Sequence, residues 1–254
     1  MTPYSCNNAI PQYPVVLDDR WFRGVIYGVV MADLWVAAQG GDRGRWSGEY
    51  DGWRSQFLRI ARAEAIGRGG SASVGAEGLT RLAQGSQSGL LLLVLPVLLV
   101  QANPYGHQSC HWQAWATGLG RSDDGRALID QAFQMVCAAM AGRPPSLGCP
   151  QGGPLATIQG LLNASQGDFV LALRLAHQGA GDPLLLRGLG AVAMIQGGWN
   201  ALPVALRHGG LESVALGQRW DGLDEEGLHQ LTLALYDRWR GRCPGSFPQD
   251  RPSV

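Results

Sequence analysis

The segment from residue 184 to residue 194 constrains the fold most, because it is apolar around almost the whole circumference of a helix. Its sequence is LLLRGLGAVAM, and Arg187 is its single charged residue. A helix without a polar stripe is typical of one surrounded by other helices in a large core. We therefore expect a central buried helix from Leu184 to Met194.

Glycines and a capping signal accompany this segment. Asp182 is a good N-cap residue, and Pro183 suits the first turn of a helix, where a missing N–H costs nothing. Each glycine inside a helix costs about 1 kcal/mol relative to alanine, so glycines here favour close approach of neighbouring backbones. They are Gly188, Gly190, Gly197 and Gly198. The pattern predicts tight helix packing around a helix that begins at Asp182.

Further helices are predicted along the chain, and no segment has the pattern of a strand. Asp18 and Asp19 are N-cap candidates for a long apolar helix that extends to Ala37. The apolar run from Gly89 to Val100 contains Pro96 and is too short to cross a bilayer, so we expect it in the core. The other expected helices cover 53–65, 127–141 after a cap at Asp123-Asp124, 154–162, 168–176, 205–216 with a break at Gly209-Gly210, and 228–239.

Length and composition suit one compact domain of 254 residues. We expect residues 1–17 to form an irregular N-terminal arm and residues 243–254 an irregular Pro-rich tail. The chain has 20 Lys and Arg and 20 Asp and Glu residues, so its charge does not favour nucleic acid or an anionic membrane. The N-terminus lacks the order of a signal peptide, which predicts a cytoplasmic protein without membrane insertion. The excess of arginine over lysine is typical of a bacterial gene of high GC content.

Residues 179–203 resemble the C-terminal signature of the ADP-ribosylglycohydrolase family. In that family an acidic Gly-Gly-Asp-Thr-Asp-Thr motif opens a central helix that contains Gly-Ala pairs and ends in Ile-Pro. Gly190-Ala191 and Leu202-Pro203 match the later part of the motif. The helix after Asp19 is similar to the family's opening helix, with Arg23, Gly24, Gly28 and Asp33 in register. The resemblance implies an all-α fold of this type, with the helix from Leu184 to Met194 at its centre.

The same resemblance implies that most metal ligands of the family are missing. Counted back from Leu202-Pro203, residues 181–184 (Gly, Asp, Pro, Leu) stand where the family has Asp, Thr, Asp and Thr. Counted forward from Phe169, Asp182 instead matches the first Asp, and both alignments remain open. The best match to the first metal motif is residues 46–50, where Glu49 is the only ligand candidate. We therefore expect no metal pair and no cofactor.

The candidate site of the family cleft is a set of scattered residues rather than a catalytic group. Ser88 replaces a family Asn, and Leu93 replaces a family Arg, so part of the cleft wall has become apolar. His107 lies where the family often has Thr-His, which favours a structural role, although its spacing to Cys110 and His111 leaves a zinc site open. The candidate residues of the former cleft are Asp33, Glu49, Ser88, His107 and Asp182.

Two functions follow from this comparison of motifs. We expect a non-catalytic protein, a pseudoenzyme, that binds another protein or serves as a regulatory subunit. The alternative is a residual hydrolase that cleaves an ADP-ribosyl or related N-glycosidic bond, with Glu49, Asp33 or Asp182 as general base or single-metal ligand. Tryptophans are candidate anchors for a protein partner. Those in polar loops or near helix ends are Trp46, Trp53, Trp112, Trp115, Trp199, Trp220 and Trp239.

Overall fold

The computed structural model describes residues 18–39, 52–67, 86–102, 122–143, 152–179, 182–204 and 213–242. These residues form helices and turns without a strand, which confirms the predicted all-α class for the described part of the chain. The elements are α1 Asp19–Ala38, α2 Trp53–Ala65, α4 Gln87–Gln101, α6 Asp123–Met140, α7 Gly153–Ala164, α8 Phe169–Gly179, α9 Pro183–Gly197, the 3-10 helix η1 Trp199–Ala201, α11 Ser213–Arg219 and α12 Glu225–Trp239.

Side-chain caps explain where most of these helices begin. Asp182 Oδ1 accepts a hydrogen bond of 2.9 Å from the backbone N–H of Leu184, as predicted for the start of α9. The same kind of cap is provided by Asp18 for α1, Ser86 for α4, Ser122 for α6, Asp168 for α8 and Asp224 for α12. The predicted cap of α6 at Asp123-Asp124 is wrong by one residue. Those two carboxylates lie in the first turn instead, where the helix dipole favours negative charge.

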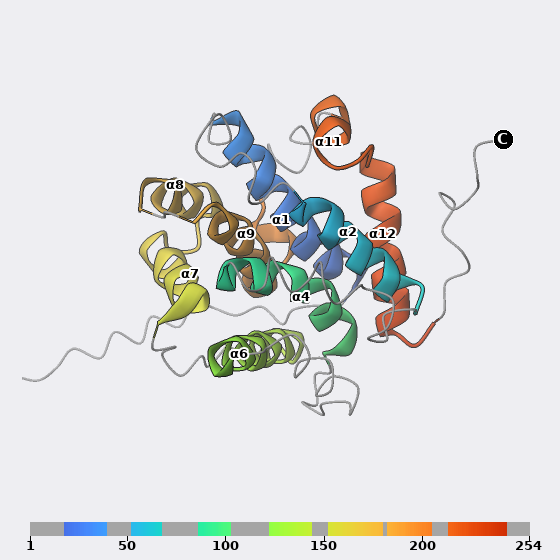
Figure 1. Ribbon diagram of the computed structural model, residues 1–254, viewed down its shortest axis with the longest axis horizontal. Coiled ribbons are helices and arrows are strands. Elements are labelled where there is room, and N and C mark those ends of the chain that lie inside the picture. The colour runs from blue at the N-terminus through green and yellow to red at the C-terminus, as the bar shows by residue number, and fades with distance from the viewer. Residues whose placement is uncertain are drawn as a thin grey trace, which may run out of the picture.

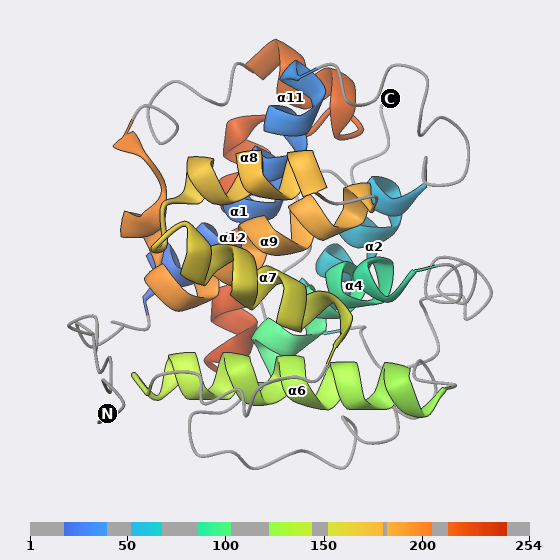
Figure 2. The same cartoon turned by 90° about the vertical axis from the view of Figure 1, so that its left-hand side faces the viewer.

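α9 is the central helix, and it packs along α1. In Figure 1, α9 and α4 lie between α7 and α8 on one side and α12 on the other. Figure 2 shows α6 running across the base of this arrangement. Every residue of α9 from Leu184 to Ile195 is buried, which confirms the predicted burial. The neighbours of α9 include the two predicted ones, α1 and α4.

Small residues allow the two backbones of α1 and α9 to touch. A Cβ atom at Gly190 would overlap the carbonyl oxygen of Gly28, and a Cβ atom at Gly28 would overlap the carbonyl oxygen of Gly190. Gly24, one turn before Gly28, lies against the backbone of Trp199. A Cβ atom added at Gly24 would be 3.2 Å from the backbone nitrogen of Trp199. Glycines at i and i+4 share one helix face, so α1 presents a flat stripe to α9 and η1. The close approach predicted for Gly190 is confirmed.

α1 is also long and largely apolar. By length and composition it could span a membrane, because an 18-residue window has a mean hydropathy of 1.3. However, 72% of that window is buried inside the molecule. A helix that is packed on most sides has this composition for the same physical reason as a membrane span. We therefore describe α1 as a core helix.

Candidate functional site

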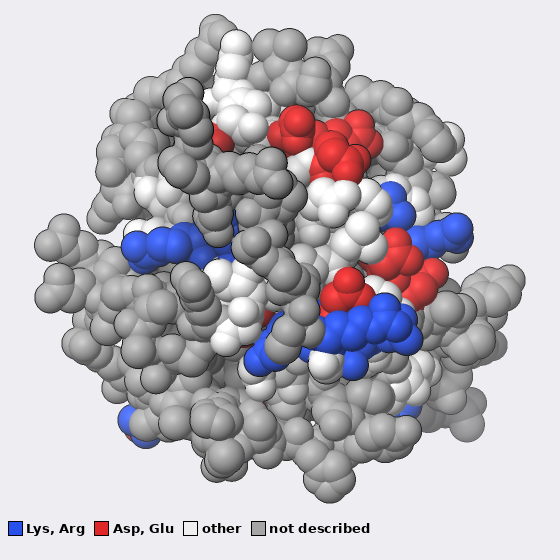
Figure 3. All heavy atoms as spheres, turned by 90° about the vertical axis from the view of Figure 1, so that its right-hand side faces the viewer, with Lys and Arg blue, Asp and Glu red and all other residues white. Residues whose placement is uncertain are grey.

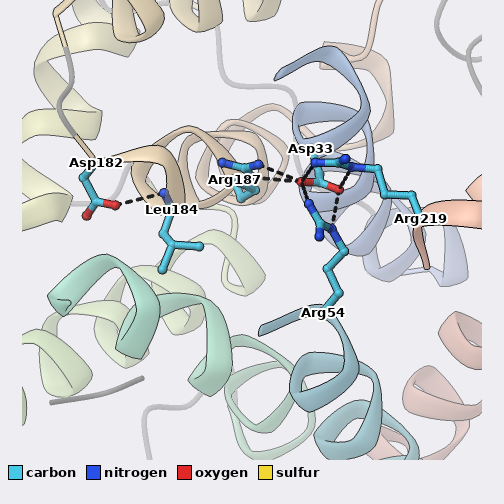
Figure 4. Close-up of polar contacts among 6 residues, drawn as sticks. All are labelled: Asp33, Arg54, Asp182, Leu184, Arg187 and Arg219. Atoms are coloured by element: carbon cyan, nitrogen blue, oxygen red, sulfur yellow. Dashed lines mark hydrogen bonds and ion pairs between the residues drawn. The ribbon is translucent and has the colours of Figure 1, made fainter. Parts of the chain in front are cut away.

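Asp33, near the C-terminal end of α1, is fully buried and lies among three arginines from three other helices. Arg54 belongs to α2, Arg187 to α9 and Arg219 to α11. Figure 4 shows the three side chains reaching the carboxylate from different directions. We call Asp33 and these three arginines the Asp33 cluster. It connects four helices, and Arg187 and Arg219 lie 154 and 186 residues after Asp33 in the sequence.

The contacts within the Asp33 cluster are short and mostly bidentate. Arg54 donates from Nε to Oδ2 at 2.8 Å and from Nη2 to Oδ1 at 2.9 Å. Arg219 repeats this geometry at 2.7 and 3.2 Å. Arg187 places both Nε and Nη2 2.9 Å from Oδ1. Because a carboxylate offers about four lone-pair sites, these donors saturate Asp33.

The electrostatics of the cluster keep Asp33 ionised. Burial alone would raise its pKa, but the hydrogen bonds from Arg54 and Arg219 and the charge of Arg187 outweigh burial and hold the pKa well below its usual range. A general base must bind a proton near the working pH, and a metal ligand must offer a lone pair. Asp33 meets neither condition in this arrangement.

Aromatic rings support the inner side of the Asp33 cluster. The guanidinium carbons of Arg54 and Arg187 lie 5.2 and 5.8 Å from the ring centroid of Trp53, within cation–π range. Trp53 in turn packs edge to face on Trp220, with ring centroids 5.3 Å apart. Trp53 is 2% exposed and Trp220 is fully buried, so neither can be a surface anchor for a partner protein. Their role is to build the core beneath the arginines.

Asp182, at the start of α9, has a structural role that uses both carboxylate oxygens. Oδ1 caps α9 through Leu184, and Oδ2 accepts a hydrogen bond of 3.0 Å from Ser86 Oγ. Ser86 is itself the cap of α4. Asp182 therefore ties together the beginnings of two central helices. Figure 4 shows it directed toward Leu184, at the far end of the picture from Asp33.

The expected apolar lining of the former cleft belongs to the core. Leu184 is fully buried and Leu93 is 1% exposed. Ser88, the replacement for the family Asn, is also buried, in the first turns of α4. These three residues are therefore buried in the core rather than exposed on the surface of a cleft. Apolar side chains at these positions gain more from burial than from contact with water.

The structure describes three of the predicted site residues, Asp33, Ser88 and Asp182. Asp33 and Asp182 lie in separate polar clusters, and Ser88 is buried in α4. Glu49 and His107 lie outside the described residues, as do Cys110 and His111. Across the described ranges, no group of three or more His, Cys, Asp and Glu side chains could hold a metal ion.

Sequence reasoning missed the three arginines that define the most polar place in the core. One signal was available in Arg187, the single charge in the apolar run from Leu184 to Met194. A charge in a buried helix needs a buried counterion. Arg54 and Arg219 gave no comparable signal, because each lies in a helix that also carries surface polar residues.

Comparison of the chain with protein-family models, with curated proteins and with solved structures finds no match. The relation to the ADP-ribosylglycohydrolases therefore stays a prediction from the motifs.

Proposed function

We propose that the chain is a non-catalytic relative of the ADP-ribosylglycohydrolases that acts as a protein-binding or regulatory subunit. The observation that carries the proposal is the saturation of Asp33 by Arg54, Arg187 and Arg219. The carboxylate that stands in register with the family's opening helix is thereby committed to holding helices together. Asp182 is committed in the same way as a helix cap.

The contrast between fold and chemistry supports this proposal. The close contact of Gly28 with Gly190 and the apolar helices α4 and α9 give a well-packed core. Hydrolysis on two hard cations would need several oxygen ligands with open lone pairs. Instead, the Asp33 carboxylate binds arginines and the Asp182 carboxylate caps a helix. A chain that retains such a core without this chemistry can still serve as a binding partner.

The surface of the described residues gives candidates for contact with another protein. Trp199 and Trp239 are half-buried, unlike Trp53 and Trp220. Trp199 lies beneath Arg23, whose guanidinium carbon is 5.1 Å from the ring centroid, and packs on Tyr27. Amphipathic tryptophans beside arginines are typical of the energetic centres of protein interfaces. On the face at the right of Figure 1, acidic and basic side chains of the described residues lie close together (Figure 3). These residues do not form a patch of one charge sign on that face.

Crosslinking in the source cells, followed by reconstitution from purified proteins, tests this proposal. A tagged full-length chain is recovered after crosslinking, the crosslinked proteins are identified by mass spectrometry, and each is purified and mixed with the chain. We expect sedimentation velocity to show a complex of fixed stoichiometry with a Kd of about 1 μM or tighter.

Two variants sharpen the reconstitution. Trp199→Ala should weaken the complex about tenfold or more, as an interface centre would. Leu171→Ala is the matched control, since Leu171 is an exposed apolar residue on α8. No reconstituted complex with any recovered protein would contradict the proposal.

A further inference from the structure

A buried tyrosine and a half-buried tryptophan meet where α1, η1 and α12 come together. α1 packs against both η1 and α12. The ring of Tyr27 on α1 packs edge to face on Trp199 of η1, with ring centroids 5.3 Å apart. Tyr27 is 4% exposed, whereas solvent reaches part of Trp199. The junction therefore combines a buried phenol with an aromatic ring at the surface.

The hydroxyl group of Tyr27 lacks a hydrogen bond within the described part of the chain. Buried tyrosine hydroxyls usually have a partner, because an unpaired one loses its hydrogen bonds to water. Burial and then the charge of Glu225 raise the pKa of Tyr27 to about 12, so the hydroxyl keeps its proton at neutral pH. It can donate one hydrogen bond and its oxygen can accept others. This unpaired group points to a ligand.

Acidic side chains of α12 give the junction its negative charge. Glu225 and Glu226 lie in the first turn of α12, both are exposed, and the charges of both act on the Tyr27 hydroxyl. The positive charge nearby is Arg23, which lies over the Trp199 ring and 3.5 Å from Asp19. The carboxylates of α12 therefore supply acceptors for a cation.

We propose that Tyr27, Trp199, Glu225 and Glu226, which we call the Tyr27 site, bind a basic side chain, lysine or arginine, of the protein partner. The inference rests on the proposed function and gives the chemistry of the partner at the surface around Trp199. A cationic N–H group can donate to the Tyr27 oxygen and to the Glu225 carboxylate. The aliphatic part of the same side chain can pack on Trp199. Such charge complementarity suppresses wrong partners.

The start of α6 shows what an acidic helix end lacks when no such site is built beside it. Like α12, α6 begins at a side-chain cap that is followed by two acidic residues in its first turn. The side chain of Asp123 in that turn is fully exposed. A cation that pairs there stays in water and gains little free energy. We therefore expect a basic side chain to prefer the Tyr27 site.

Titration of the full-length chain with a capped tetralysine peptide tests the inference without the partner. The indole N–H signal of Trp199 is followed by NMR and is assigned by its loss in Trp199→Phe. A capped tetraglutamine peptide at equal ionic strength is the uncharged comparison. We expect tetralysine, but not tetraglutamine, to shift this signal saturably. No saturable shift with tetralysine overturns the inference.

This result is separate from the fate of the proposed function. Failure of the proposed function appears as the lack of a reconstituted complex, which the peptide titration does not measure. A reconstituted complex whose affinity is the same in Tyr27→Phe and Glu225→Gln as in the unmodified chain would overturn the Tyr27 site and leave the proposed function standing.

Variants assign the peptide binding to this junction. Tyr27→Phe should weaken tetralysine binding about tenfold, because it removes a hydrogen bond to a charged group. Glu225→Gln should weaken it about threefold to fivefold, and this exposed substitution should fold even if Tyr27→Phe does not. Asp123→Asn is the matched control, and its affinity should not change. Unchanged affinity in Glu225→Gln, or an equal loss in Asp123→Asn, overturns the assignment.

Discussion

Arg187 on α9 and Asp33 on α1 are 154 residues apart in the chain, yet Arg187 Nε lies 2.9 Å from Asp33 Oδ1 inside the core. Both side chains are almost completely withdrawn from solvent. This contact joins the two helices that pack most closely in the fold, and it turns a carboxylate expected in a cleft into a structural anchor.

Asp33→Asn should destabilise the protein by roughly 3–5 kcal/mol, because removing one partner of a buried ion pair leaves buried charge uncompensated. The change is measured as the free energy of unfolding in urea at pH 7. Asp130→Asn is the matched control, since Asp130 is an exposed aspartate on α6 and should change stability little. A loss below about 1 kcal/mol in Asp33→Asn would show that the cluster is not a structural anchor.

Gly190→Ala should destabilise by about 3 kcal/mol or more, at the upper end of overpacking costs, because its Cβ atom would overlap the backbone of Gly28. Gly160→Ala gives the control in another helix, α7, where a Cβ atom meets nothing within 4 Å. That substitution should stabilise by up to about 1 kcal/mol through helix propensity. Both values come from thermal or urea unfolding. Equal effects of the two substitutions would rule out the close contact between α1 and α9.

Stability should fall as pH rises between about 4.5 and 7 because of Glu64. Burial raises the pKa of this glutamate to about 7, against an ordinary value of 4.5, although the charge of Arg238 lowers it. Because the pKa of Glu64 is higher in the folded than in the unfolded state, its contribution to the free energy of unfolding is fully present below the unfolded pKa. That contribution is lost as pH rises through the folded pKa. Between pH 4.5 and 7 the free energy of unfolding should therefore fall by roughly 3 kcal/mol.

Glu64→Gln removes the ionisation and should therefore flatten this part of the pH profile. At pH 8 the variant should be more stable than the unmodified chain, and at pH 4 the two should be similar. Urea unfolding at a series of pH values checks both statements. A profile that keeps the same slope in Glu64→Gln would mean that another group causes it.

Asp182 is predicted to act as a cap and not as a metal ligand. Asp182→Ala should cost about 1 kcal/mol, whereas Asp182→Asn, which keeps a capping oxygen, should cost much less. If Asp182 were a metal ligand, both variants would weaken metal binding, because both remove its negative charge. Calorimetric titration with Mn²⁺ alongside urea unfolding separates the two roles. Tight Mn²⁺ binding that both variants abolish would contradict the capping role.

Much of the helical framework could be predicted from the sequence, because local signals decided it. The spacing of Trp53, Phe57 and Ile60 located α2, and Asp182 with Pro183 located the start of α9. Gly190 signalled close packing, and the structure confirms this through its backbone contact with Gly28. These features depend on neighbouring residues or on one helix face, where periodicity and capping are informative.

The polar cluster could not be predicted, because it depends on contacts between distant segments. Arg54, Arg187 and Arg219 meet only after α2, α9 and α11 have packed around α1. Trp220 follows a short helix whose sequence gives no sign of burial, yet it lies fully inside beside Trp53. Glu49 and His107, the other candidate site residues, lie outside the described part of the chain.

The absence of catalysis is the central claim, and a turnover assay tests it most directly. The full-length chain is incubated with ADP-ribosyl-arginine and Mn²⁺ or Mg²⁺, and released ADP-ribose is measured against a reaction without protein. We predict no release above that background, because Asp33 is saturated by arginines, and Asp182 caps α9 and accepts a hydrogen bond from Ser86, the cap of α4. Metal-dependent release of ADP-ribose that Glu49→Ala abolishes would contradict the account.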